Sequence, residues 1–147
     1  MTDTNPQTLA QLIALVESSN NQFAMRHEPA FKNYYQKDIQ QYAKIAGVTN
    51  DTAEICLASS WGLYQIMGIN LLRFGLQISF VHYCCAIDVQ LLYFNKFLQQ
   101  NKLAQYAAMP LDQFMADESA LMDFAIRYNG PGNPAAYAAR MKLVGGA

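Results

Sequence analysis

Residues 59–68 read SSWGLYQIMG, and this run constrains the fold because it has two polar partners far away in the chain. Upstream, Glu17 and Ser18 close an apolar helical pattern. Downstream, residues 128–132 read YNGPG, a sequence that breaks helices. A carboxylic acid, a glycine-containing polar turn and a tyrosine–asparagine corner therefore follow one another along the chain. We expect a fold that brings these three clusters into one cleft.

The first cluster lies at the end of an expected helix. Its apolar positions have the i, i+3, i+4, i+7 spacing of one helix face: Leu9, Leu12, Ile13 and Val16. Thr8 or Thr4 can cap its start, and the polar residues 18–21 compete for backbone groups and end it. Glu17 therefore lies in the last turn, beside the apolar edge. The negative helix end and partial burial both disfavour ionisation, which suits a proton donor.

The remaining elements are mostly helical by pattern, and the expected fold class is mainly α. Helices are predicted over residues 32–46, 52–58, 61–74, 78–100 and 118–128 and from Pro134 onward, with short pieces at 103–106 and 111–115. Gly47 ends the first of these helices. Ser60 caps the helix at 61–74, and Gly75 ends it. Strand signals are weak, and a small hairpin within residues 21–31 is the only one expected. No linker or repeat divides the chain, so we expect one domain over residues 1–147.

Composition excludes several classes of protein. The 147 residues carry a formal net charge of −1 and no basic patch, which argues against nucleic acid as a partner. The most apolar run, residues 74–98, is interrupted by His82, Asp88, Gln90 and Lys96, so it predicts a core helix and no integral membrane segment. The polar residues 1–7 show no secretory signal.

The cysteines and histidines favour structural roles. Cys56, Cys84 and Cys85 are odd in number and two are adjacent, which predicts buried free thiols and no disulfide framework. His27 and His82 lack the spacing of metal ligands, and His82 lies in an apolar stretch that predicts a core position. No metal site and no cofactor are expected.

Two carboxyl groups lie in or near the motifs, Glu17 and Glu28. A single glutamate is most often a solvated surface charge, and Glu28 has Arg26 and Lys32 nearby as ion-pair partners. Cleavage of a glycosidic bond requires a protonated carboxyl and usually a second carboxylate. Only the combination with the other motifs favours this second interpretation.

The run at 59–68 also allows two interpretations. Gly62 permits close backbone approach, Gln65 offers amide donors and an acceptor for sugar groups, and Tyr64 can stack on a sugar face. The alternative is a plain amphipathic helix whose core face is Leu63, Ile66 and Met67. That alternative leaves Tyr64 and Gln65 unexplained, just as a simple helix stop leaves Tyr128 and Asn129 unexplained.

Taken in order, these residues resemble the lysozyme-like superfamily of goose-type lysozymes and lytic transglycosylases. The closer resemblance is to the N-acetylmuramidase domain of phage endolysins. It is carried by residues 16–18 (VES), 26–29 (RHEP), 59–68 and 128–132, and it extends from about Leu9 to Met141. One departure is that residues 19 and 20 are Ser and Asn, where the family usually has Gly after Glu-Ser. The segment between Glu17 and Glu28 is also short, and a shorter loop can move Glu28. The resemblance therefore places Glu28 less securely than Glu17.

The resemblance implies a muramidase that cleaves the β-1,4 bond between N-acetylmuramic acid and N-acetylglucosamine and so lyses bacterial cell walls without a cofactor. It implies that Glu17 is the general acid and Glu28 the second functional carboxylate. The residues implied to line the sugar cleft are Ser60, Tyr64, Gln65, Tyr128 and Asn129. The implied partner is the peptidoglycan glycan strand, bound by a monomer that has no separate wall-binding module.

Two alternatives accompany this expectation. A lytic transglycosylase would use one glutamate and form 1,6-anhydro-muramyl products. A non-catalytic wall-binding or phage structural module could use the same scaffold, although Glu17 weighs against it. The absent secretory signal implies synthesis in the cytoplasm and release toward the wall by a holin or a secretion system.

Overall fold

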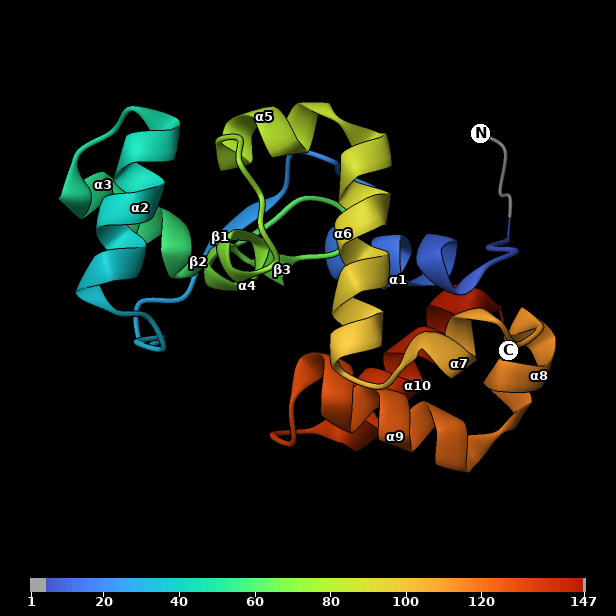
Figure 1. Ribbon diagram of the computed structural model, residues 1–147. Coiled ribbons are helices and arrows are strands. Elements are labelled where there is room, and N and C mark those ends of the chain that lie inside the picture. The colour runs from blue at the N-terminus through green and yellow to red at the C-terminus, as the bar shows by residue number, and fades with distance from the viewer. Residues whose placement is uncertain (1–4, 147) are drawn as a thin grey trace.

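A computed structural model describes residues 5–146, and within them the fold is mainly α, as predicted (Figure 1). The helices in the described part are α1 (Leu9–Ser18), α2 (Gln36–Ala46), α3 (Asn50–Leu57), α4 (Gly68–Arg73), α5 (Phe80–Cys85), α6 (Ile87–Gln100), α7 (Ala104–Ala107), α8 (Leu111–Ala116), α9 (Glu118–Asn129) and α10 (Pro134–Gly145). The strands are β1 (Met25–His27), β2 (Ser59–Trp61) and β3 (Ile66–Met67).

Helix α1 forms as its periodicity predicts. Thr8 caps it, because its hydroxyl accepts a hydrogen bond from the backbone N–H of Gln11 while the Gln11 side chain reaches back to Thr8. The helix ends at Ser19, whose φ of 54° is left-handed. The other candidate cap, Thr4, lies outside the described residues. Glu17 is therefore in the last helical turn, next to the buried Val16.

The three strands form an antiparallel sheet in the order β1-β2-β3, with Met25 opposite Trp61 and Ser60 opposite Met67. The predicted hairpin within residues 21–31 is wrong. Strand β1 does lie in this segment, but it pairs with β2, which is distant in the chain. The hairpin of this fold joins β2 to β3.

The predicted helix over residues 61–74 is also wrong in its first half, since α4 begins only at Gly68. Residues 62–65 form the turn of the β2–β3 hairpin, where Gly62 has φ 77° and Gln65 has φ 49°. Neither angle is compatible with a right-handed helix. A Cβ on Gly62 would lie 2.3 Å from Oε1 of Gln90, so only glycine fits this position.

Gln90 is the buried group that holds this turn. Its Oε1 accepts from the backbone N–H of Leu63 at 2.7 Å, and its Nε2 donates to the carbonyl of Cys84 at 3.0 Å. The side chain has no exposed surface. A buried amide that makes these bonds specifies one turn conformation, because any other would leave polar groups unpaired.

The long helix predicted over residues 78–100 is two helices, α5 and α6, which meet at Ala86 with extended backbone angles. His82 was expected in the core, but it is exposed on α5 beside Ser79. In Figure 1, α6 runs between the part that holds β1–β3 and the part that holds α7–α10. Its buried Phe94 forms a stacked pair with Tyr64, whose ring centroid is 4.3 Å away.

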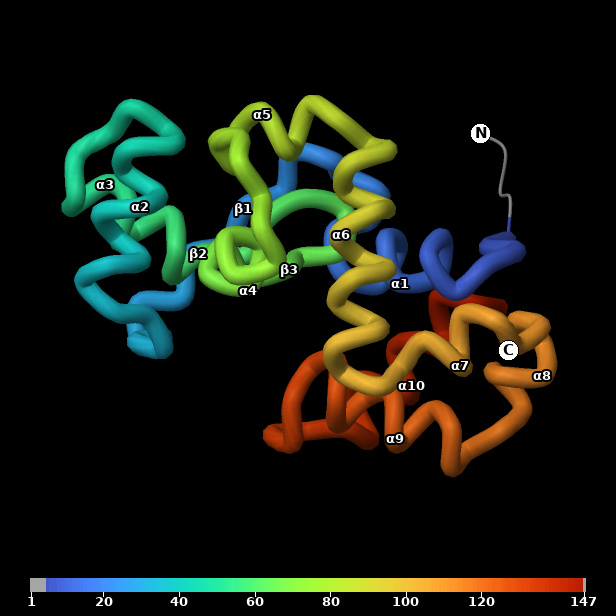
Figure 2. The backbone as a smooth tube through the Cα atoms, in the orientation of Figure 1, coloured from blue at the N-terminus to red at the C-terminus, as the bar shows by residue number. Residues whose placement is uncertain are grey.

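The C-terminal helices bring the end of the chain back to its start. As predicted, the chain breaks after α9, and Pro134 occupies the first turn of α10. Asn133 caps this helix. Helix α10 packs against both α9 and α1, so the red end of the trace lies beside its blue start (Figure 2). This return places side chains of α10 next to Glu17.

The cysteines within residues 5–146 form no disulfide. Cys84 is buried, as expected for a free thiol, but Cys56 is only partly buried and Cys85 is exposed. None of the described helices has the length and apolar character needed to cross a bilayer.

Candidate active site

A cleft of about 350 Å³ lies between two walls of the fold. The helical wall consists of Glu17 from α1 together with Tyr128 and Asn129 from α9. The strand wall is formed by the β1–β3 region and contributes Arg26, Glu28, Phe31, Ser60, Gln65 and Met67. All of the side chains proposed from the sequence therefore line one cleft, except that of Tyr64.

Glu17 is the partly buried acid of this cleft. Its Oε1 accepts a hydrogen bond from the hydroxyl of Tyr137 at 2.6 Å. Burial raises the pKa of Glu17 above its ordinary value and outweighs three effects that lower it, namely the Tyr137 hydrogen bond and the positive charges of Arg140 and Arg26. The protonated form is favoured relative to a glutamate in water, as the sequence argument anticipated.

Tyr137 is a site residue that sequence reasoning missed. Its ring is buried on α10, as is the side chain of Met141 one turn later. Its hydroxyl, however, reaches a carboxyl 120 positions earlier in the chain. Burial and the adjacent Glu17 raise the pKa of Tyr137 well above its usual range, so the phenol keeps its proton and remains a donor.

Glu28 occupies the opposite wall in a very different environment. Its backbone N–H donates to the carbonyl of Ala58, which continues the pairing of β1 with β2. Its carboxylate forms an ion pair with Nε of Arg26 at 2.6 Å, and its side chain keeps 40% of its surface exposed. Of the two cations considered for it, Arg26 is the partner, and Lys32 pairs with Glu54 instead.

Ser60 and Gln65 form a rigid part of the strand wall. The Ser60 hydroxyl donates to Oε1 of Gln65 at 2.7 Å. The Gln65 amide donates to the carbonyls of Ala24 and Gly62, at 3.2 and 3.0 Å. These bonds explain why a polar side chain occurs in this turn: Gln65 closes it and ties it to the segment before β1. The edge of this network faces the cleft.

Tyr64 was expected to contact sugar, and the structure corrects this. Only 5% of its surface is exposed, because its ring packs on Phe94 in the core. The turn of the β2–β3 hairpin directs this side chain inward. Its backbone carbonyl accepts from the hydroxyl of Tyr128 at 2.7 Å, so Tyr128 links the two walls. Asn129 is exposed at the end of α9.

Ser18, the partner of Glu17 in the sequence motif, fixes the end of α1 to the turn. Its hydroxyl lies 3.0 Å from the carbonyl of Ala14 and 2.9 Å from the carbonyl of Leu63. The second contact joins the helical wall to the strand wall directly beside Glu17. The carboxyl is therefore held by Tyr137 on one side and by an anchored helix end on the other.

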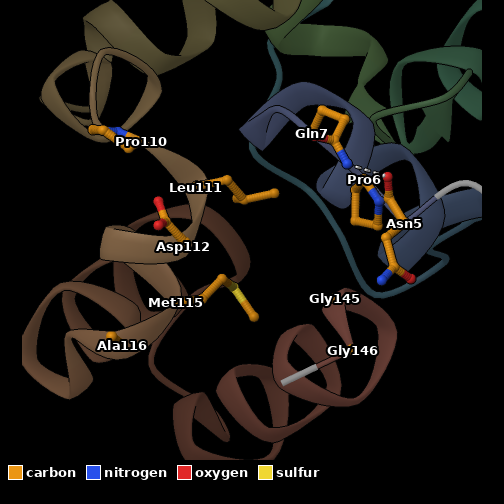
Figure 3. A pocket seen from close by; sticks show the side chains of 10 residues that line it. All are labelled: Asn5, Pro6, Gln7, Pro110, Leu111, Asp112, Met115, Ala116, Gly145 and Gly146. Carbon is orange, nitrogen blue, oxygen red and sulfur yellow. Dashed lines mark hydrogen bonds between the residues drawn. The ribbon is translucent and has the colours of Figure 1, made fainter.

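A larger cavity of about 620 Å³ lies elsewhere, between the segment before α1, α8 and the end of α10 (Figure 3). Its lining, as far as the described residues form it, holds one ionisable side chain, Asp112, and none of the residues of the cleft. It lacks the pair of carboxyl groups that acid-assisted cleavage requires. Within residues 5–146, no group of three or more His, Cys, Asp or Glu side chains is placed to hold a metal ion.

A mainly α domain that places a partly buried glutamic acid and a second, ion-paired carboxylate in one polar cleft has the arrangement of carboxyl groups that glycoside-cleaving enzymes use. Comparison with known proteins agrees. The sequence model of the N-acetylmuramidase family matches residues 4–144. An endolysin of Enterobacteria phage PRD1 is 34% identical over 134 residues, which cover 84% of this chain and 86% of that protein. No solved structure matches the chain.

The chain therefore belongs to the N-acetylmuramidase family. It is a glycoside hydrolase that acts on peptidoglycan, and neither alternative considered from the sequence is favoured.

Proposed function

We propose that this protein hydrolyses the β-1,4 bond between N-acetylmuramic acid and N-acetylglucosamine, with Glu17 as general acid and Glu28 as the second functional carboxylate. The observation that carries the proposal is the environment of Glu17. This carboxyl is partly buried, its pKa is raised, and it lies in the same cleft as the ion-paired Glu28, whose side chain keeps 40% of its surface exposed. Two carboxyls in contrasting environments are the arrangement that separates an acid from a base.

In the proposed reaction, Glu17 protonates the glycosidic oxygen as the bond to C1 of the muramyl residue breaks. The Tyr137 hydroxyl occupies Oε1 as a donor, so the acid proton is carried on Oε2. After the proton has left, the Tyr137 bond and the charges of Arg140 and Arg26 stabilise the carboxylate that remains. The site thus favours the protonated form at rest and supports the charged form once it appears.

Glu28 would act on the positive charge that develops at C1 as the same bond breaks. An exposed carboxylate can stabilise that charge directly or remove a proton from the attacking water. The ion pair with Arg26 limits the positions that the Glu28 side chain can take. Ser60, Gln65, Tyr128 and Asn129 would form the polar floor on which the sugars lie.

The PRD1 relative is named an endolysin, and we propose the same use for this protein: lysis of the cell wall by cutting its glycan strands. Residues 1–147 would act as a single catalytic domain and as a monomer. We further propose synthesis in the cytoplasm and release to the wall by a holin or a secretion system.

Digestion of purified sacculi followed by mass analysis of the fragments tests this reaction. Hydrolysis adds one water per cut and leaves reducing N-acetylmuramic acid ends. Fragments that end in 1,6-anhydro-muramic acid would overturn the proposal in favour of a transglycosylase, and reducing N-acetylglucosamine ends would show that the other β-1,4 bond is cut. Intact sacculi after prolonged digestion would refute the proposed activity altogether.

A further inference from the structure

A second cavity of about 310 Å³ adjoins the cleft and shares Glu17, Arg26 and Asn129 with it. It extends along the first turns of α10, where its other lining residues are Asn133, Ala136, Tyr137 and Arg140. We call it the arginine cavity. Because Glu17 lines both cavities, a group bound in the arginine cavity lies close to the glycosidic oxygen that Glu17 would protonate.

The arginine cavity is rich in hydrogen-bond donors. Arg26 and Arg140 contribute guanidinium groups, and the charge of each lowers the pKa of Glu17, so both lie close to that carboxyl. Asn133 uses its Oδ1 to cap α10 at the N–H of Ala136, which leaves its amino group for another acceptor. Apart from Glu17 itself, the described residues of the lining include no acidic side chain.

Arg140 is the better candidate of the two arginines for holding a ligand. Arg26 already pairs with Glu28, whereas none of the ion pairs found within residues 5–146 includes Arg140. The Arg140 guanidinium lies 5.3 Å from the centre of the Tyr137 ring, a contact that holds the side chain over α10. A guanidinium positioned in this way favours a bidentate contact with a carboxylate.

The substrate of the proposed function carries such a group on alternate sugars. Every muramyl residue has a lactyl ether that ends either in its own carboxylate or in a peptide with carboxylates, and N-acetylglucosamine has neither. The overall charge of the protein, −1, provides no general attraction for anions. A local cationic contact would therefore distinguish one sugar of each pair.

We propose that the arginine cavity is a subsite for the carboxylate borne by the lactyl chain of N-acetylmuramic acid, with Arg140 as its principal contact. The proposal rests on the proposed function and adds a determinant of specificity. Holding the muramyl residue by its lactyl side chain places one of the two alternating β-1,4 bonds at Glu17. It also predicts that the free enzyme discriminates between charged and neutral lactyl chains.

The test uses soluble tetrasaccharides of alternating N-acetylglucosamine and N-acetylmuramic acid in three forms. In one form the stem peptides keep their carboxylates, in the second those carboxylates are converted to primary amides, and in the third the peptides are removed, which exposes the lactyl carboxylate. The variants are Arg140→Gln and Arg140→Lys. Lys142→Gln is the matched control, because it removes one positive charge from the same helix outside the arginine cavity.

We expect Arg140→Gln to raise KM on a charged substrate about tenfold more than on the amidated substrate, as loss of a charge-assisted hydrogen bond does, whereas any effect of Arg140 through Glu17 should be the same on both. Arg140→Lys should restore part of the loss, and Lys142→Gln should behave as wild type on all three substrates. A loss on the peptide-free substrate identifies the lactyl carboxylate as the ligand. A loss confined to the peptide-bearing substrate identifies a peptide carboxylate.

An equal loss on the charged and amidated substrates would overturn the subsite and show that Arg140 acts only through Tyr137 and Glu17. No loss on any substrate would overturn it as well. Failure of the proposed function gives a different result, because wild type would then cleave none of the three substrates, or Glu17→Gln would cleave them at the wild-type rate.

Discussion

The two walls of the cleft hold the same chemical group in opposite ways. On the helical wall, Glu17 is partly buried at the end of α1 and accepts a hydrogen bond from the neutral donor Tyr137. On the strand wall, Glu28 follows an edge strand, keeps 40% of its side chain exposed and pairs with the charged donor Arg26. Burial favours the carboxylic acid form of a glutamate, whereas exposure beside a cation favours the carboxylate.

Since the two residues are chemically identical, the proposed difference in their roles would come from the fold around each of them. The helical wall is held together by packing of α1 against α10 and of α10 against α9. The strand wall is held by the hydrogen bonds of three short strands and a turn. A substitution at one wall should therefore have consequences different from those of the same substitution at the other.

The largest effect is expected for Glu17→Gln. The amide can still accept from Tyr137 but cannot give a proton, so the rate of sacculus lysis should fall by about 10²- to 10⁴-fold, the range of general acid catalysis. Turbidity loss of purified sacculi measures it. Glu54→Gln is the matched control, because Glu54 also accepts from a tyrosine, Tyr34, but lies outside the cleft. Equal activity of the two variants would remove Glu17 from the mechanism.

Glu28→Gln should have a smaller effect, about 10- to 100-fold in kcat, because the neutral amide still fills the space but no longer opposes positive charge at C1. Folding should be unaffected, since the broken ion pair is largely exposed. Glu118→Gln, which breaks the exposed pair with Lys142, is the control. A loss as large as that of Glu17→Gln would mean that the two carboxyls share the acid role.

The helical wall could be predicted from the sequence because its signals are local. The spacing of Leu9, Leu12 and Val16, the cap at Thr8 and the polar stop after Glu17 all lie within one short segment. They sufficed to place the carboxyl at a buried helix end and to give the direction of its pKa shift. Here local propensity and the tertiary fold agree.

The strand wall could not be predicted in this way. Leu63, Ile66 and Met67 have helical spacing, and this local pattern predicted a helix through the turn. The turn is decided by groups distant in sequence: pairing of β2 with β1 and the buried amide of Gln90. Tyr64 was misplaced for the same reason, because its direction depends on that turn.

Tyr137 shows a third limit. Its position on the buried face of α10 was predictable, but its bond to a residue 120 positions away was not. Periodicity identifies which side chains are buried, and it does not show which polar atom of a buried tyrosine finds a partner. A phenol on an apolar helix face near the chain end is the available signal, since buried tyrosines usually pair their hydroxyl.

Tyr137→Phe should slow lysis by about three- to tenfold, since one hydrogen bond to a buried carboxyl is lost. The Tyr137 bond lowers the pKa of Glu17, so its removal raises that pKa further. The alkaline limb of the pH–rate profile should therefore move to higher pH, because Glu17 keeps its proton longer. Tyr34→Phe, which removes the comparable bond to Glu54, should leave the profile in place. An unmoved limb in Tyr137→Phe would show that the bond does not govern ionisation of Glu17.

The smallest expected effect is on stability, and it tests the burial of Glu17 independently of catalysis. Because burial raises the pKa of Glu17 above 4.5 in the folded protein, the native state binds this proton more tightly than the unfolded chain does. The free energy of unfolding should fall as the pH rises from 4.5 through the raised value, since the unfolded chain releases its proton first, and should change no further above it. In the Glu17→Gln variant, the free energy of unfolding should not show this fall, because residue 17 no longer binds a proton.

The Glu17→Gln variant should therefore gain more in unfolding temperature over wild type at about pH 7 than at about pH 4. At about pH 4, the Glu17 carboxyl of wild type is mostly protonated in both the folded and the unfolded protein. Thermal unfolding of both proteins at the two pH values measures the difference, in which other titrating groups cancel. If the Glu17→Gln variant gained nothing at neutral pH, the helical wall would not bury its acid, and the contrast between the walls would fail.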